Sequence, residues 1–209
     1  MLKPRIREEE WEWTWAPYDA PTYQLVLEQI EPGDIVLDIG AGDLRMSSQI
    51  AARARWVYAL EINDLLWRGM SSALPANLQV ITGDARVIPF ADNITTAVLL
   101  MRHCTHFSLY FDKLQDAGCR RLITNARWGV GVEKIDLDGP RCSYDMIPFG
   151  WYACRCGSRG FKPGPAEALT EIIADRVWEL SSCPSCNHTT QIHRSSNTAS
   201  YTSRWGSSW

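Results

Sequence analysis

The sequence predicts an α/β protein built on a doubly wound, mainly parallel sheet, followed by a smaller cysteine-containing module. Between residues 35 and 128, apolar stretches of strand length alternate with segments of helical spacing. This alternation favours parallel strands joined by right-handed crossovers. Three of the apolar stretches end in glycine or an acidic residue. After Trp128, glycine, proline, cysteine and aromatic residues become frequent and the strands become short, which indicates a second structural unit.

The individual elements are predicted from hydrophobic periodicity and from the glycine and proline residues that end helices and strands. Tryptophans at positions 11, 13 and 15 recur at period two, which fits a short strand or an extended flap. A further helix is expected to open at Gly164-Pro165, because the apolar residues from Ala168 to Leu180 recur on one helical face. We expect the other helices at residues 22–30, 46–55, 64–72 and 107–117, and strands at 35–39, 56–62, 78–82, 95–101 and 121–126.

The composition is that of an ordinary globular protein. Hydrophobic residues make up 45% of the 209 residues, and the net charge is −3. A chain of this charge has no global positive field for nucleic acid, and only a local basic patch is compatible with it. No apolar run approaches the roughly 20 residues of a membrane span, and the N-terminus lacks the core of a signal peptide. We therefore expect a cytoplasmic protein without membrane contact, whose seven cysteines bind metal or stay reduced.

The strongest functional signal is the first strand and the turn that follows it. Val36 to Ile39 is an apolar run that contains Asp38 and leads into Gly40 and Gly42. A buried strand that ends in a glycine turn exposes backbone N–H groups, and the glycines allow a ligand to approach the main chain closely. The second strand ends at Glu61 and the third at Asp84. This spacing predicts a nucleoside site at one edge of the sheet.

Residues 35–90 resemble the cofactor pocket of class I S-adenosylmethionine-dependent methyltransferases. The runs 54–63 and 77–85 look most like those of rRNA adenine dimethyltransferases. The resemblance implies that the turn formed by Asp38, Gly40 and Gly42 packs against the amino-acid part of the cofactor. It also implies that Glu61 accepts hydrogen bonds from both ribose hydroxyls, which suits a carboxylate. Asp84 would lie near the adenine amino group, with Ala85 beside the ring.

Two other interpretations of this pocket remain open. A nicotinamide-binding Rossmann domain also places an acid after its second strand, but the third glycine of its G-x-G-x-x-G turn is Arg45 in this chain. Asp38 would also face the negative diphosphate of a dinucleotide, whereas the ammonium of a methionine moiety would attract it. The third possibility is a nucleotide-binding type of fold with a purely structural role.

The methyl acceptor normally reaches the pocket at the end of the fourth strand, here residues 101–107. Adenine-N6 enzymes carry an Asn/Asp-Pro-Pro-Tyr-like segment there, and this chain has none, so the adenine substrate is not carried over. Arg102 is a candidate for holding an anionic acceptor, and His103 and His106 are candidates for a general base. Asn125 and Arg127 end the fifth strand on the same predicted rim. The alternative roles are helix capping for the histidines and capping or surface pairing for Asn125 and Arg127.

Four cysteines in two close pairs predict a zinc site. Cys154 and Cys156 are separated by one residue, and Cys183 and Cys186 by two, which is the usual zinc-ribbon spacing. Four thiolates leave no open coordination position, so the metal is expected to be structural. A disulfide or redox site and unliganded thiols are the alternatives, and His188 or His193 is an alternative ligand to one of the cysteines.

Taken together, these observations predict an S-adenosylmethionine-dependent methyltransferase with RNA slightly favoured as acceptor. Arginine and aromatic residues of the zinc module can contact RNA or a protein partner, or complete a small core. The alternative function is a non-catalytic scaffold subunit with a methyltransferase fold. The expected segments are an N-terminal flap and helix at 1–34, the cofactor-binding domain at 35–150, the zinc-ribbon-like module at 151–194 and a flexible tail at 195–209.

Overall fold

The computed structural model describes residues 17–69, 74–102, 104–129 and 131–186. The chain divides into two compact units between Gly139 and Pro140. Residues 140–150, which the sequence analysis assigned to the first domain, therefore belong to the second unit. The predicted strand or flap around Trp11, Trp13 and Trp15 and the predicted tail at 195–209 lie outside the described residues.

The first unit contains a six-stranded sheet with the order β3-β2-β1-β4-β5-β6. Strands β1 to β5 are parallel, and β6 pairs antiparallel with β5 at one edge. This confirms the predicted doubly wound, mainly parallel α/β fold. The strands are β1 (Ile35–Ile39), β2 (Trp56–Glu61), β3 (Leu78–Thr82), β4 (Thr96–Leu99), β5 (Arg121–Thr124) and β6 (Glu133–Asp136).

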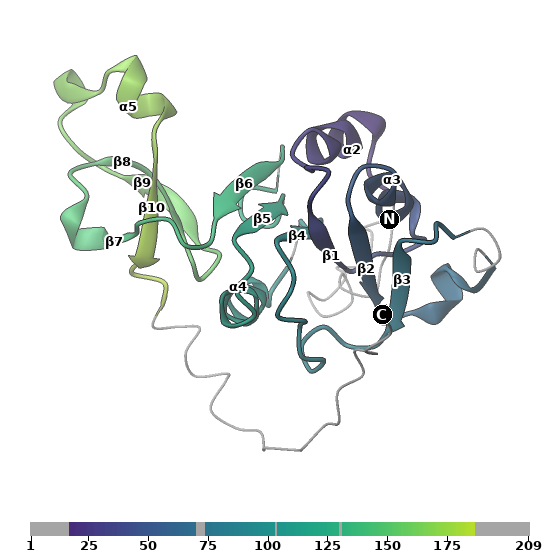
Figure 1. Ribbon diagram of the computed structural model, residues 1–209. Helices are drawn as coiled ribbons and strands as arrows, with labels where there is room; N and C mark the ends of the chain where they lie inside the picture. The colour runs from purple at the N-terminus through teal and green to yellow at the C-terminus, as the bar shows by residue number, and fades with distance from the viewer. Residues whose placement is uncertain (1–16, 70–73, 103, 130, 187–209) are drawn as a thin grey trace, which may run out of the picture. The chain divides into compact units, whose positions relative to one another are not determined.

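Helices cover both faces of this sheet (Figure 1). Helices α2 (Ala20–Leu27) and α3 (Arg45–Ala51) lie on one face, and α4 (Phe107–Asp116) lies on the other. Successive strand residues point to opposite faces, so Val36 packs with α2 and α3 while Leu37 packs with α4. Both faces of the central strands are therefore buried, which explains their continuous apolar sequence.

Local signals explain where the helices begin and end. Asp19 caps α2 by accepting a hydrogen bond from the backbone N–H of Thr22 at 3.0 Å. Helix α4 ends before Gly118, whose φ of +71° is the left-handed conformation that glycine adopts most easily. The helix predicted at residues 64–72 is replaced, in its described part, by the short 3₁₀ helix η1 (Asp64–Leu66). Within the described residues, no helix combines the length and the apolar character that crossing a membrane requires.

The buried carboxylate of Asp34 connects the amino-terminal ends of three strands of this sheet. Asp34 is 4% exposed and accepts hydrogen bonds from the hydroxyls of Thr95 at 2.9 Å and Thr96 at 3.0 Å. It also accepts from the backbone N–H of Glu31 and forms an ion pair with Arg121. The carboxylate therefore connects the loop before β1 to the starts of β4 and β5.

The second unit contains a four-stranded sheet with the order β7-β10-β8-β9. Strand β10 is parallel to both of its neighbours, whereas β8 and β9 form an antiparallel hairpin. Its small core contains Ile147, Cys154, Leu180 and Cys183. The elements are β7 (Cys142–Ser143), η3 (Tyr144–Met146), β8 (Gly150–Cys154), β9 (Arg159–Lys162), η4 (Ala166–Ala168), α5 (Glu171–Asp175) and β10 (Val177–Ser182).

The long helix predicted from Gly164-Pro165 to Leu180 is wrong. Only α5 and a single 3₁₀ turn are helical in this range, and the chain then continues as β10. Ile172 of α5 is 81% exposed, so the apolar face that the periodicity indicated is not buried there. Leu180 is instead fully buried in a strand that pairs on both sides. These long-range pairings override the local helical pattern.

Replacing Asp34 with alanine should strongly destabilise the first unit. The change leaves the Arg121 guanidinium and two threonine hydroxyls without their shared acceptor, so we expect a loss of about 3–5 kcal/mol in the free energy of unfolding. Urea denaturation measures this loss, with exposed Asp92→Ala as a matched control that should stay within about 0.5 kcal/mol of the wild type. A loss for Asp34→Ala no larger than that of the control would contradict the role of Asp34.

Candidate functional site

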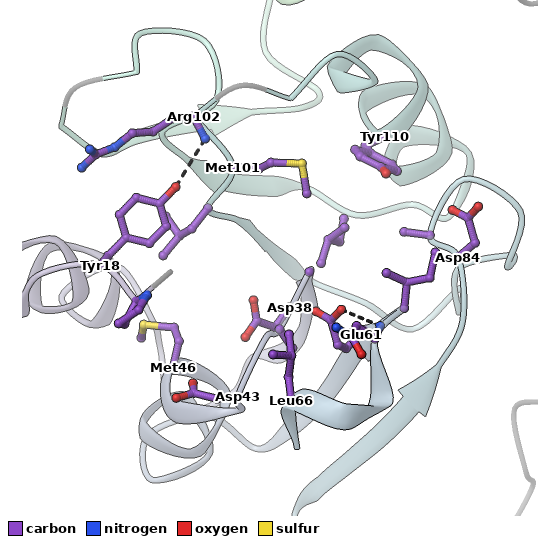
Figure 2. A pocket seen from close by; sticks show the side chains of 18 of the residues that line it. Tyr18, Asp38, Asp43, Met46, Glu61, Leu66, Asp84, Met101, Arg102 and Tyr110 are labelled. Carbon is purple, nitrogen blue, oxygen red and sulfur yellow. Dashed lines mark hydrogen bonds between the residues drawn. The ribbon is translucent and has the colours of Figure 1, made fainter. Parts of the chain in front are cut away.

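A cavity of about 480 Å³ opens at the carboxyl ends of β1 to β4 (Figure 2). Open α/β sheets bind ligands at this edge, where neighbouring strands lead to opposite faces. The loops after all four strands contribute to the cavity, as do residues 17–19 and Tyr23 from the start of α2 and Tyr110 from α4. All predicted cofactor residues except Gly42 line it, and the amide of Gly42 is bonded to a carboxylate in its wall.

The turn after β1 has the backbone conformation that its glycines predict. Gly40 and Gly42 have φ values of +74° and +58°, which side-chain-bearing residues rarely adopt. The N–H groups of Gly40 and Ala41 both donate to the carbonyl of Leu60, at 2.9 and 3.1 Å, which fixes the turn against β2. A Cβ on Gly40 would lie 3.4 Å from the Cε of Met101, which is an ordinary van der Waals contact. The positive φ is therefore the feature that favours glycine at this position.

Asp38 is a buried carboxylate at the base of this turn. It is 3% exposed, and the hydroxyl of Ser47 donates to it at 2.6 Å. Burial raises the pKa of Asp38 to about 6, and the nearby charge of Glu61 contributes in the same direction, while the Ser47 hydrogen bond opposes both. A cationic group in the cavity would favour the charged form.

Glu61 connects the end of β2 to the glycine turn. One carboxylate oxygen accepts from the backbone N–H of Gly42 and the other from that of Asn63, each at 2.8 Å. The side chain is 6% exposed and lines the cavity. Each oxygen retains further acceptor capacity, so a bound diol can donate to both. The predicted contact with ribose stays a prediction, but the carboxylate is held in place for it.

Asp84 forms a close ion pair that the sequence analysis did not predict. The Nε of Arg86 lies 2.9 and 3.0 Å from its two oxygens. Burial acts to raise the pKa of Asp84, but the hydrogen bonds and charge of Arg86 outweigh it and hold that pKa below its ordinary value. The carboxylate therefore remains charged beside the cavity, with part of its acceptor capacity already used.

A lysine from α4 holds the loop that contains Ala85. The ammonium of Lys113 donates to the carbonyl of Ala85 and, at 2.6 Å, to that of Ile88. Burial lowers the pKa of Lys113 to about 8, although the charge of Asp84 opposes the shift. Ala85 is buried and lines the cavity, so α4 fixes the wall that the resemblance assigns to the adenine ring.

Arg102 lines the cavity at the end of β4 and interacts with Tyr18. The backbone N–H of Arg102 donates to the Tyr18 hydroxyl at 3.3 Å, and its guanidinium carbon lies 4.9 Å from the centre of the Tyr18 ring. Figure 2 shows this pair on one side of the pocket, and Asp84 and Tyr110 on the other. The sequence analysis did not identify Tyr18, because no local pattern connects it to residues more than 80 positions away.

The other predicted acceptor-side residues are placed differently. His103 lies outside the described residues. His106 occupies the N-cap position of α4, where its Nδ1 lies 3.1 Å from the hydroxyl of Thr105, and it is not among the described residues that line the cavity. Asn125 is 2% exposed and is also absent from the described lining; its side-chain oxygen has no hydrogen-bond partner in the described part of the chain.

Arg127 forms an ion pair, but in the interior and not at the surface as the sequence analysis expected. Its guanidinium is bound by both carboxylate oxygens of Glu133, at 3.0 and 2.6 Å, and the side chain is 1% exposed. This buried ion pair connects the end of β5 to the start of β6. Arg127 therefore stabilises the sheet edge.

The four predicted cysteines converge in the second unit. All four sulfur atoms lie within 4.8 Å of one another. The Sγ atoms are 3.6 Å apart for Cys154 and Cys186, 3.6 Å for Cys156 and Cys183, and 3.9 Å for Cys183 and Cys186. A tetrahedral zinc ion with Zn–S bonds of about 2.3 Å requires sulfurs about 3.8 Å apart. The donor set and spacing therefore fit zinc.

Backbone geometry explains how both cysteine pairs reach this cluster. The N–H of Cys183 donates to the Sγ of Cys186 at 3.2 Å, and the N–H of Cys186 donates to the carbonyl of Cys183 at 3.0 Å, so this pair forms a tight turn. The shorter pair lies at the hairpin between β8 and β9, where the N–H of Cys154 donates to the carbonyl of Ser158 and Gly157 adopts a φ of +93°. Because of this tight turn, Cys154 and Cys156 both reach the cluster although only one residue separates them. The alternative ligands His188 and His193 lie outside the described residues.

Comparisons with known proteins extend over part of the chain. No family model matches it. A 73-residue stretch, 34% of the chain, is 33% identical to the ribosomal RNA small subunit methyltransferase A of Moorella thermoacetica, and it covers only 25% of that protein. The solved precorrin 8w decarboxylase of Methanobacterium thermoautotrophicum is 25% identical, with a TM-score of 0.43 over 52% of this chain and 63% of that one. A dimethyladenosine transferase of Plasmodium falciparum is 19% identical, with a TM-score of 0.44 over 51% and 41% of the two chains.

The first unit has the class I S-adenosylmethionine-dependent methyltransferase fold. Its sheet order, antiparallel edge strand and glycine turn are typical of this fold. The chain also has weak partial sequence similarity to a ribosomal RNA methyltransferase. The four-cysteine cluster of the second unit is consistent with the predicted zinc module.

Removing the buried charge of Asp38 should stabilise the protein in a pH-dependent manner. Burial raises the pKa of Asp38 to about 6, so the folded protein binds this proton more tightly than the unfolded chain does. The buried charge therefore lowers the free energy of unfolding by its full amount above about pH 6, and it has no effect below about pH 4, where Asp38 is protonated in both states. Asp38→Asn keeps an oxygen for Ser47, and we expect its stabilising effect to be about 1 kcal/mol larger near pH 7.5 than near pH 5. Urea denaturation at both pH values measures this difference.

The exposed variant Asp92→Asn is the matched control, and its effect on the free energy of unfolding should not change between the two pH values. An Asp38→Asn effect that is the same at both pH values would show that Asp38 carries no buried charge.

Proposed function

We propose that the first unit binds S-adenosylmethionine and transfers its methyl group to an acceptor, with RNA favoured. One observation carries this proposal. Three strands in succession place Asp38, Glu61 and Asp84 around a single cavity of about 480 Å³, in the order that the class I cofactor site uses. The cavity volume is within the roughly 300–1,000 Å³ typical of small-molecule sites.

The charge of the cavity suits this cofactor. S-adenosylmethionine carries an ammonium and a sulfonium cation, so a carboxylate-lined cavity attracts it more strongly than it attracts an anionic dinucleotide. Asp38 is the candidate partner of the ammonium, because its burial makes its charge costly until a cation compensates it. Glu61 is the candidate partner of the ribose hydroxyls, since the Gly42 and Asn63 amides leave both oxygens able to accept.

The chemistry requires mainly orientation from the protein. When bound, the cofactor supplies a methyl group on an excellent leaving group, and the transfer needs an in-line nucleophile. The rigid turn at residues 40–42 and the wall held by Lys113 would fix the position of the cofactor. The acceptor would enter beside Met101 and Arg102 at the end of β4.

The preference for RNA rests on the partial similarity to a ribosomal RNA methyltransferase. The atom methylated is a separate matter, because residues 101–107 lack the Asn/Asp-Pro-Pro-Tyr-like segment of adenine-N6 enzymes. This absence also supports the second candidate function, a non-catalytic scaffold subunit. Incubation with a labelled methyl donor and fractionated RNA, protein and metabolite pools identifies the acceptor, and label in no pool would favour the scaffold.

We further propose that the cysteine cluster holds one structural zinc ion. Four thiolates fill a tetrahedral shell and leave no position for substrate, so the metal would stabilise a unit whose apolar core is small.

Glu61→Ala should weaken cofactor binding about 10- to 100-fold, the range expected for losing hydrogen bonds to a charged acceptor. Calorimetric titration with S-adenosylmethionine measures the affinity, and Glu28→Ala at the exposed C-cap of α2 is the matched control with unchanged affinity. Unchanged affinity in Glu61→Ala would remove the ribose assignment. A folded wild-type protein that releases no heat at millimolar cofactor would favour the scaffold function.

Elemental analysis should find about one zinc ion per chain. Cys186→Ser should lose the metal after gel filtration in a chelator, because three thiolates bind zinc less tightly than four do. Cys142→Ser in the same unit, outside the cluster, should keep it. A metal-free chain with a cooperatively folded second unit would contradict the zinc proposal.

A further inference from the structure

The charges around the cavity are distributed unevenly. Among the described residues, its lining carries five carboxylates and two arginines. One of these arginines, Arg86, is bound to Asp84. The carboxylate of Asp43 is likewise bound by Arg45, at 2.9 Å. Arg102 differs, because no carboxylate of the described chain forms an ion pair with it. The five carboxylates belong to Asp19, Asp38, Asp43, Glu61 and Asp84.

Arg102 is both exposed and held in position. Its guanidinium carbon lies 4.9 Å from the centre of the Tyr18 ring, and its backbone N–H donates to the Tyr18 hydroxyl at 3.3 Å. Tyr18 is held in turn, because its own N–H donates to the hydroxyl of Tyr23 in α2 at 3.2 Å. The charge of Arg102 also acts on the carboxylate of Asp19, which caps α2, and contributes to the lowered pKa of that carboxyl group. Stacking on a ring restricts the guanidinium while leaving its N–H edges available.

The position of this cation separates it from the part of the cavity assigned to the cofactor. Figure 2 shows Arg102 and Tyr18 away from Asp84, and Arg102 follows β4, the strand at whose end the acceptor is expected. A cationic cofactor would be repelled by Arg102, whereas an anionic group on the acceptor would be attracted. A planar guanidinium matches the oxygens of a phosphate in a bidentate arrangement.

We propose that Arg102, held by Tyr18, binds a backbone phosphate of a single-stranded RNA acceptor and so places the target nucleotide at the cavity. The proposal rests on the proposed function and specifies the class of group that the acceptor presents. A backbone phosphate is favoured because every nucleotide carries one, so a single fixed cation beside the cavity can position whichever base enters it.

The test uses the salt dependence of binding, which counts phosphate contacts. The affinity for a fluorescein-labelled oligouridylate of about ten nucleotides is measured by anisotropy between about 50 and 200 mM KCl. Arg102→Gln should weaken binding about five- to tenfold at low salt and reduce the slope of log K against log salt by about 0.7, the value for one single-strand phosphate. Arg102→Lys should keep the slope but lose part of the affinity, because an ammonium is not bidentate.

The stacking role of Tyr18 is tested separately. Tyr18→Leu removes the ring and should weaken binding about two- to fivefold, the range of an exposed cation–π contact, with the salt slope unchanged. Tyr18→Phe keeps the ring and should stay within about twofold of the wild type. Arg68→Gln is the charge-matched control, because Arg68 is exposed, pairs with Asp64 and does not line the cavity.

The opposing outcomes are distinct. An unchanged salt slope in Arg102→Gln, or an equal reduction in Arg68→Gln, would overturn the proposal. Displacement of the oligonucleotide by equimolar inorganic phosphate would show a free-phosphate site and overturn it as well. Equal Arg102-dependent binding of an oligoglutamate would show a carboxylate acceptor instead. Calorimetry of the wild type with S-adenosylhomocysteine tests the cofactor-binding part of the proposed function independently, since oligonucleotide binding is measured without cofactor.

Discussion

The site depends on one carboxylate that joins two strand ends. Glu61 accepts hydrogen bonds from the backbone amides of Gly42 and Asn63, so the turn after β1 and the loop after β2 share one anchor. The parallel pairing of β1 and β2 brings Glu61 within hydrogen-bonding distance of the Gly42 amide, because Asp38 lies opposite Ala59 and Ile39 opposite Leu60. A one-residue change of register would turn Glu61 to the other face of the sheet. The register of β1 against β2 therefore determines the geometry of the site.

The two ends of the sheet use buried carboxylates differently. At the amino-terminal ends, Asp34 is surrounded by hydroxyl donors and Arg121, so its charge is compensated within the protein. At the carboxyl ends, Asp38 accepts a side-chain hydrogen bond from Ser47, and its pKa is raised by burial. The first arrangement stabilises the fold, whereas the second keeps a charge that a cationic ligand can compensate. This contrast is the physical reason to place binding at the carboxyl ends.

Much of the first unit could be predicted from local sequence. The five parallel strands have continuous apolar sequences because both of their faces are buried, and the glycines at 40, 42 and 118 mark turns with positive φ. The acids at the strand ends, Glu61 and Asp84, also followed from the same pattern. The helix predicted up to Leu180 failed because its residues satisfy a helical period locally but pair as the central strand β10 in the fold.

The sequence by itself determined the alternation of strands and helices in the first unit, the positions of the acidic strand ends and the two cysteine pairs, because each is a local pattern of residue type and spacing. Only the tertiary structure decided which side chains meet. It brings Tyr18 to Arg102, Arg127 to Glu133 in a buried ion pair, and Asn125 into the interior beyond the cavity lining. Such contacts join segments through the packing of the sheet and its helices, and a linear sequence carries no short-range signal for them.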